Sequence, residues 1–237
     1  MLESFKRLFA RPGRAPDLGG IADWALRCGH NFKRARGDAG FVVDGRLEDR
    51  PWRMAWGVPQ RPYIDGRELR LRMELALPSQ AQMLLLSRPL LDVLERQTFD
   101  DFTDNVQTHM GANSPEEMRW LVMFPKVDMS TLKTLQPRFG AVASAPAAGL
   151  AWLEGPLARL LEDAADELLR GDPPFLLMTL RGRAYLRMQL AVPDAKSVSA
   201  ALALFETAVT QALHVGRKPL PDPDAGPSET GGAEDVD

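Results

Sequence analysis

The chain has 237 residues, of which 45% are hydrophobic and 26% charged, as in an ordinary globular protein. Its net charge is -3, but residues 1–220 hold all 29 basic residues and 26 of the 32 acidic ones, a net charge of +3. A nearly neutral body lacks the strong positive field of a dedicated nucleic-acid-binding protein. The single cysteine, Cys28, excludes an internal disulfide, and no apolar run approaches the roughly 18 residues that cross a bilayer.

Residues 1–20 predict a basic amphipathic segment followed by a linker. Apolar residues recur at helical spacing until Pro12 and Gly13 end the pattern, with basic residues around them. Such a segment contacts an anionic membrane surface or a partner, folds back on the protein body, or is frayed. The apolar residues are Leu2, Phe5, Leu8 and Phe9, and the basic ones are Lys6, Arg7, Arg11 and Arg14.

The pattern of apolar and polar residues over 21–110 predicts a first α+β unit. A helix from Ile21 to Arg36 places Trp24, Ala25, Cys28 and Phe32 on one face and ends at Gly37. Strands follow at 40–48, 51–58, 68–77 and 81–87, and then a helix that begins after Ser87. The strand at 68–77 has the clearest pattern, because aliphatic and polar residues alternate along it. This alternation predicts that Leu71, Leu75, Trp52 and Trp56 are buried.

Residues 111–218 predict a second α+β unit packed on the first, and residues 219–237 a disordered acidic tail. Ser114 has the position of an N-cap in the capping box Ser-Pro-Glu-Glu. A strand at 138–144, a helix at 156–170, a hairpin around Gly182 and a helix at 196–214 follow. The predicted fold is α+β, an antiparallel sheet of five to seven strands with helices packed on one face.

Two segments resemble each other internally. LRMELALPS at 71–79 and LRMQLAVPD at 186–194 share six of nine residues. The repeat indicates either two related helix-hairpin-helix units or the convergence of amphipathic strands written in few residue types. In both cases Arg72 and Arg187 fall at the same place in their strands.

The stretch 50–72 holds six arginines and three aromatic residues. The pattern fits a strand face with ion pairs to Glu68 and Glu74, a surface for a phosphate or other anion, or a nucleic-acid surface. Nucleic-acid modules stack bases on exposed aromatics, so the predicted burial of Trp52 and Trp56 disfavours the last reading. The candidate binding residues are Arg53, Arg61, Arg67, Arg70 and Arg72.

Asp100, Asp101 and Asp104 form a second candidate site. Their spacing resembles the magnesium-binding DDxxD motif of prenyl-diphosphate enzymes. That family is all-helical and requires a second acidic motif, which this sequence lacks. His109 is close enough in sequence to form an acid–base pair with Asp104.

The sequence contains no CxxC, HExxH, GxSxG, Walker A or GxGxxG motif, so we expect no cofactor and no structural metal. The best expectation is a non-catalytic, cytoplasmic bacterial protein that binds a protein or an anionic small molecule. The alternative is a metal-dependent enzyme that uses Asp100, Asp101, Asp104 and His109. Contact of residues 1–14 with a membrane surface is a further option for a partner.

Overall fold

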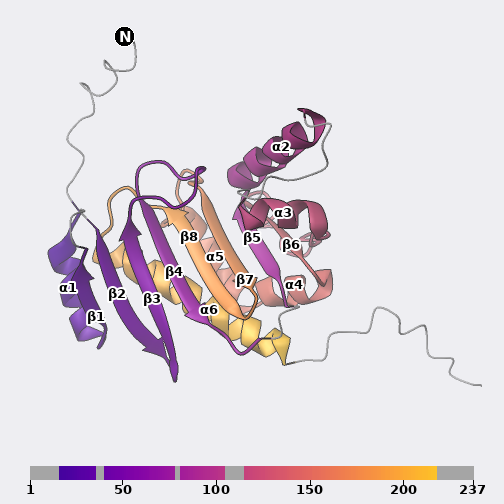
Figure 1. Cartoon of the computed structure of the whole chain (residues 1–237). Coiled ribbons are helices and arrows are strands. Elements are labelled where there is room, and N and C mark those ends of the chain that lie inside the picture. Colours follow the sequence, from indigo (N-terminus) through magenta and orange to yellow (C-terminus); the bar gives the residue numbers. More distant parts are fainter. Residues whose placement is uncertain (1–15, 36–39, 78–80, 105–114, 218–237) are drawn as a thin grey trace, which may run out of the picture.

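The computed structural model describes residues 16–35, 40–77, 81–104 and 115–217, without the side chains of 100–104. These ranges contain six helices and eight strands (Figure 1). The helices are α1 (Leu18–Arg27), α2 (Arg88–Asp104), α3 (Glu116–Met123), α4 (Pro146–Leu153), α5 (Pro156–Asp166) and α6 (Ala195–Gly216). The strands are β1 (Asn31–Arg34), β2 (Phe41–Leu47), β3 (Arg50–Gly57), β4 (Glu68–Glu74), β5 (Met83–Ser87), β6 (Phe139–Ala143), β7 (Phe175–Leu180) and β8 (Arg183–Gln189).

The strands form one antiparallel sheet in the order β1-β2-β3-β4-β8-β7-β5-β6. The predicted α+β class with an antiparallel sheet is confirmed, although the sheet has eight strands rather than five to seven. Strands from both predicted units alternate in it. β4 pairs with β8, and β5 lies between β7 and β6. Residues 21–110 and 111–218 therefore share a single sheet.

The two repeated segments meet in the middle of this sheet. Leu71 of β4 is the cross-strand partner of Leu186 of β8, which is the equivalent residue of the repeat. Because the strands are antiparallel, a local two-fold axis between these leucines relates the two segments. Arg72 and Arg187 therefore project from the same face of the sheet, on opposite sides of that axis.

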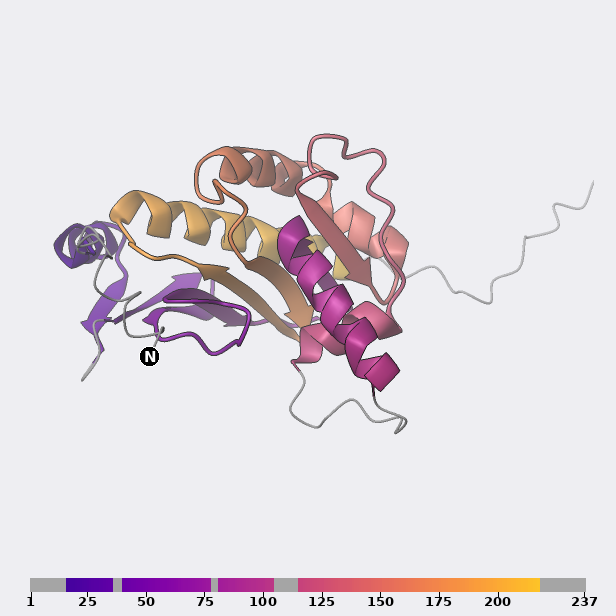
Figure 2. The ribbon, with the colours of Figure 1, turned by 90° about the horizontal axis from the view of Figure 1, so that it is seen from above.

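Helices α1, α4, α5 and α6 cover one face of the sheet (Figure 2). The main hydrophobic core lies between these helices and the inward-facing residues of the strands. Trp52, Trp56, Leu71 and Leu75 belong to this core, which confirms the burial predicted from their alternation. Apolar burial of this kind is the dominant stabilising contribution to such a fold.

Helices α2 and α3 pack on the opposite face over β5, β6 and β7, and Tyr185 of β8 packs against the edge of the same cluster. Leu84 and Leu86 of β5 face these helices, whereas Leu85 faces the main core. β5 is thus buried on both sides, which explains its unbroken apolar sequence. This departs from the expected placement of all helices on one face. The outer face of β1–β4 and β8 is left without a covering helix in the described ranges (Figure 1).

The first helix is shorter than predicted. It ends at Arg27 rather than Arg36, because Gly29 has φ of 72° and residues 31–34 pair with β2. Cys28 is therefore exposed and does not lie on a buried helical face. The predicted stop at Gly37 lies outside the described residues.

Two further differences concern the second half of the chain. Helix α3 has Pro115 as its N-cap with no side-chain capping bond, whereas the predicted N-cap, Ser114, lies outside the described residues. Helix α4 was not predicted. It packs closely on β6, since a Cβ at Gly149 would lie 2.8 Å from the Cβ of Ala143.

Helix α6 is long and apolar enough to cross a membrane when judged by length and composition alone. In this fold Val198, Phe205 and Val209 pack into the main core, as in a core helix. The predictions for residues 1–14 and 219–237 concern segments outside the described ranges.

Candidate functional site

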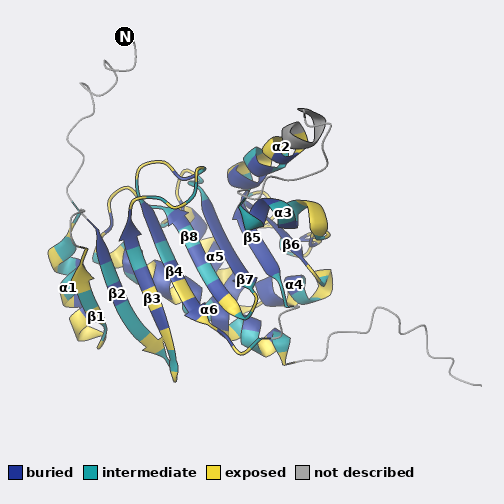
Figure 3. Ribbon diagram, in the orientation of Figure 1, coloured by how far each residue is buried: buried dark blue, intermediate teal, exposed yellow. Residues whose placement is uncertain are grey.

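The uncovered outer side of β1–β4 and β8 is the candidate site, and we call it the open face. Buried and exposed residues alternate along its strands, so every second side chain projects outward (Figure 3). Most of these outward side chains are charged, with more basic groups than acidic ones. The charged residues of the open face are Lys33, Asp44, Arg46, Arg53, Glu68, Arg70, Arg72, Glu74, Arg183 and Arg187.

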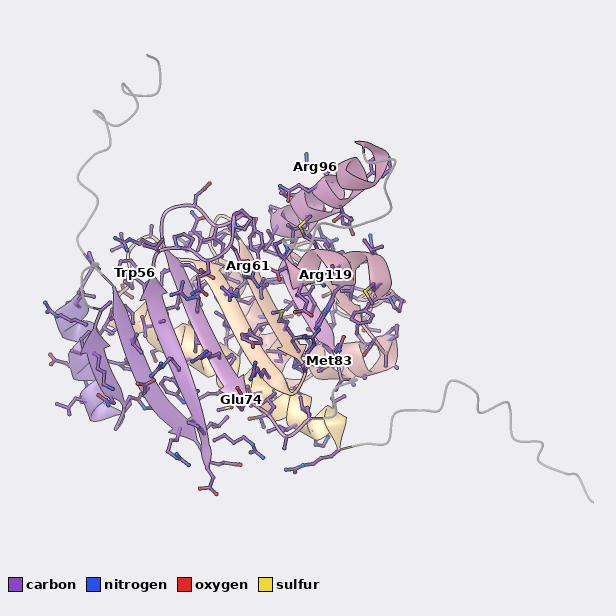
Figure 4. The ribbon with its side chains drawn as sticks, viewed as in Figure 1. Trp56, Arg61, Glu74, Met83, Arg96 and Arg119 are labelled. Atoms are coloured by element: carbon purple, nitrogen blue, oxygen red, sulfur yellow. The ribbon has the colours of Figure 1, made fainter. Side chains whose placement is uncertain are left out.

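A depression of about 490 Å³ lies at one end of the open face. It spans β2, β3, β4 and β8, and Glu74 marks its position (Figure 4). The polar groups that line it are Asp44, Arg53, Arg72, Glu74, Arg183 and Tyr185.

Arg53 and Asp44 form a two-pronged ion pair across β3 and β2. Arg53 Nε lies 2.7 Å from Asp44 Oδ1, and Nη2 lies 3.2 Å from Oδ2. The hydrogen bond from Arg53 lowers the pKa of the Asp44 carboxyl below its ordinary value, and the nearby charges of Lys33 and Arg72 act in the same direction. Asp44 therefore stays ionised, and its carboxylate takes up hydrogen-bond donors of Arg53.

Arg183 and Glu74 form a second such pair on the other side of the depression. Arg183 Nε donates to both carboxylate oxygens of Glu74, at 2.8 and 3.0 Å. Both side chains are exposed to solvent, so the pair adds little to stability. It does fix the position of a positive charge at the rim of the depression.

Arg72 lies between these two ion pairs, and unlike Arg53 and Arg183 it is not paired with a carboxylate of the described residues. It is exposed, and it makes no hydrogen bond or ion pair with any other residue that the structure describes. Its cross-strand partners are Arg53 on β3 and Tyr185 on β8. The guanidinium of Arg72 is therefore open to a ligand, with its donors unused.

The end of the open face opposite the depression contains a buried carboxylate, Glu68, which is fully inaccessible to solvent. Its Oε1 lies 2.6 Å from Arg187 Nη1, and its Oε2 accepts from Arg70 Nη1 at 3.2 Å and from the backbone N–H of Gln60 at 2.6 Å. Arg70 also donates to the Val58 carbonyl. These two arginines are bound within the structure.

Glu117 of α3 is a second fully buried carboxylate. It accepts from Arg61 Nε at 2.6 Å and from the hydroxyl of Tyr63. Burial raises the pKa of Tyr63, and the charge of Glu117 acts in the same direction, so the phenol stays protonated as a donor. The cluster connects the loop between β3 and β4, where Figure 4 labels Arg61, to α3.

The structure brings only part of the predicted binding set together. Arg53, Arg70 and Arg72 share the open face, whereas Arg61 is paired with Glu117 in the adjoining loop. Arg67 lies over the ring of Trp56, 5.2 Å from its centroid. The site residues missed from the sequence are Arg183 and Tyr185 of β8. The repeat gave a signal for this strand, since it equated Arg187 with Arg72, but not for its position beside β4.

The structure does not describe the side chains of the predicted acidic site. Asp100, Asp101 and Asp104 lie in the last turns of α2, where no side chains are described, and His109 lies outside the described residues. Elsewhere in the described chain, no three His, Cys, Asp or Glu side chains come together in a way that suits a metal ion. The metal-dependent alternative stays a prediction.

No protein-family model and no curated protein matches this sequence. Among solved structures, the chain is similar to the crystal structure of the mycobacterial trehalose monomycolate transport factor A, TtfA. The similarity covers 86% of this chain and 97% of that one, at 9% sequence identity and a TM-score of 0.46. A likeness of this degree gives no indication of the ligand or the activity of this chain.

Proposed function

We propose that this chain is a non-catalytic binding protein whose open face engages an acidic segment of a protein partner at Arg72. The observation that carries the proposal is the exposed guanidinium of Arg72, which is unpaired within the described residues and set between two ion-paired arginines. Arginine binds carboxylates through two parallel N–H donors, a geometry that an incoming Asp or Glu side chain matches.

The charge of the depression supports an anionic occupant. Arg53, Arg72 and Arg183 outnumber Asp44 and Glu74 along its lining, which leaves one positive charge in excess. The two acids are each bound to an arginine, Asp44 to Arg53 and Glu74 to Arg183. An anion placed above Arg72 therefore meets three guanidinium groups.

The shape of the site favours a protein segment over a small molecule. The depression is shallow and lies on a sheet face five strands wide, without the enclosing walls that bury most of a small ligand. Tyr185 adds an aromatic ring beside Arg72, and tyrosine and arginine are both enriched at protein interfaces. Binding through such exposed charges weakens as salt is added.

The test measures binding of a fluorescein-labelled peptide of alternating Glu and Gly at low salt. Arg72→Gln is expected to weaken binding about tenfold, the loss of one charge-assisted hydrogen-bonded contact. The matched control is Arg159→Gln, which removes an exposed arginine from α5 on the other side of the sheet. This control is expected to bind the peptide as the wild-type chain does.

Inorganic pyrophosphate serves as the second probe and separates the two kinds of ligand. Arg72-dependent binding of pyrophosphate without binding of the peptide would identify a small anion as the ligand instead. Equal binding by the wild-type chain and Arg72→Gln, with both probes, would contradict the proposal.

A further inference from the structure

A groove between α5 and α6 lies on the helical side of the molecule, away from the open face. It has a volume of about 280 Å³. Its floor is apolar, with Leu160 from α5, Leu168 just after that helix and Leu204 from α6. Ala200 and Ala203 are exposed on the α6 side, where their small side chains leave room for an incoming element.

The rim of this groove is acidic. Asp163 lies on α5, Glu167 is the C-cap of that helix, and Asp194 is the N-cap of α6. Lys196 is the one basic group in the lining, and its Nζ is paired with Glu167 at 2.6 Å. Asp163 makes no ion pair within the described residues. A ligand that suits this groove is therefore apolar on one side and basic on the other.

The chain itself contains such a segment, and it begins beside the groove. The backbone N–H of Asp17 donates to the carbonyl of Pro193 at 3.3 Å, immediately before Asp194. The first described residues therefore lie at the N-terminal end of α6, where α1 also packs (Figure 2). Residues 1–14 carry four basic residues and one acid, around apolar residues at helical spacing.

We infer that residues 2–9 of this chain bind as an amphipathic helix in the groove between α5 and α6. The apolar stripe of Leu2, Phe5, Leu8 and Phe9 covers the apolar floor, and the flanking basic residues face the acidic rim. Eight helical residues are about 12 Å long, and the α6 side of the groove, from Asp194 to Leu204, extends about 15 Å. The dimensions therefore match.

The connection is long enough to reverse direction. Residues 10–16 span up to about 23 Å when extended, and they contain Pro12 and Gly13, which end a helix and permit a turn. An isolated helix of this length is marginal in water. Its stability on this protein thus derives from the groove.

The test uses the full chain with a nitroxide label. Cys28, the only cysteine, is replaced by Ser, and Ser4→Cys carries the label. The expected result is loss of amide signal intensity at Ala164, Leu168 and Ala200, with the signal of Glu95 on α2 unaffected. Unchanged intensities along the groove would overturn the inference.

Two variants show whether the groove itself holds the segment. Phe5→Asp combined with Leu8→Asp, or Ala203→Arg alone, is expected to restore the amide intensities. The matched control Thr210→Arg adds the same charge at an exposed position of α6 outside the groove and is expected to leave the attenuation in place. Attenuation that survives both disrupting changes contradicts docking in the groove, as does binding of phosphatidylglycerol vesicles through residues 1–14 without attenuation.

Discussion

Arg53 and Arg72 are direct cross-strand partners on β3 and β4. Like charges placed directly opposite each other destabilise a sheet. Asp44 accepts two hydrogen bonds from Arg53, whereas Arg72 makes no hydrogen bond to a carboxylate among the described residues. A second arginine pair, Arg70 and Arg187, is bridged by buried Glu68. We therefore expect Arg72 to add less to the stability of the sheet than the ion-paired arginines.

The first prediction is that Arg72→Gln keeps or increases stability. Removing the repulsion from Arg53 is expected to raise the free energy of unfolding by up to about 1 kcal/mol. Urea denaturation of the variant and the wild-type chain measures the difference. A loss of stability would show that Arg72 is a structural residue.

The second prediction concerns Glu68, which is expected to be essential for the fold. Glu68→Ala leaves Arg70 and Arg187 in a partly buried position without their shared carboxylate. Breaking a buried ion pair in this way costs about 3–5 kcal/mol. The same reasoning shows that replacing Arg70 together with Arg72 would mix folding with binding, so only Arg72 is suitable for binding studies. Denaturation midpoints close to wild type for Glu68→Ala would contradict the assignment.

The third prediction is that the free energy of unfolding depends on pH through the Asp44–Arg53 pair. The pKa of Asp44 is lower in the folded chain than its ordinary value, mainly because of the hydrogen bond from Arg53. The folded state therefore binds the proton less readily than the unfolded state, and the stability from this pair is complete above the ordinary pKa. It is lost as the pH falls through the folded pKa. Arg53→Gln is expected to make the acid-side decline of unfolding free energy shallower, and an unchanged decline would argue against the pair.

The fourth prediction tests the packing beneath the depression. A Cβ at Gly45 would lie 2.2 Å from the ring of Trp52, its cross-strand partner in the core. Gly45→Ala must shift this ring and is expected to destabilise the protein by about 1–3 kcal/mol. The control is Gly19→Ala in α1, where the added Cβ meets only Asp17 at 3.8 Å. This control is expected to raise stability by about 0.5–1 kcal/mol.

The sequence predicted side-chain direction well in strands with one solvated face. The alternation in β3 and β4 identified Trp52 and Leu71 as core and Arg53 and Arg72 as outward residues, because burial on one face imposes a period of two. It did not predict that β8 adjoins β4. Strand order depends on long-range pairing, which local periodicity does not encode. For the same reason the sequence did not predict that Glu68 forms ion pairs with both Arg70 and Arg187.

Some of the helices were predicted from the sequence and others were not. Helix α5 and helix α6 were predicted because their apolar residues form clear stripes. Helix α4 was missed because its eight residues are apolar nearly all round and include Pro146 and Gly149. The placement of α2 and α3 on the outer face was also unexpected. It follows from the double-sided burial of β5 and β7, whose continuous apolar runs do not show which face a helix covers.

The most direct test of the account is the Nε–Hε NMR signal of Arg72 during titration of the full chain with the Glu-Gly peptide at low salt. We predict that this signal shifts progressively and saturates, while the signal of Arg61, held by Glu117, stays in place. An Arg72 signal that does not move, or that moves only together with that of exposed Arg159, would contradict binding at the open face.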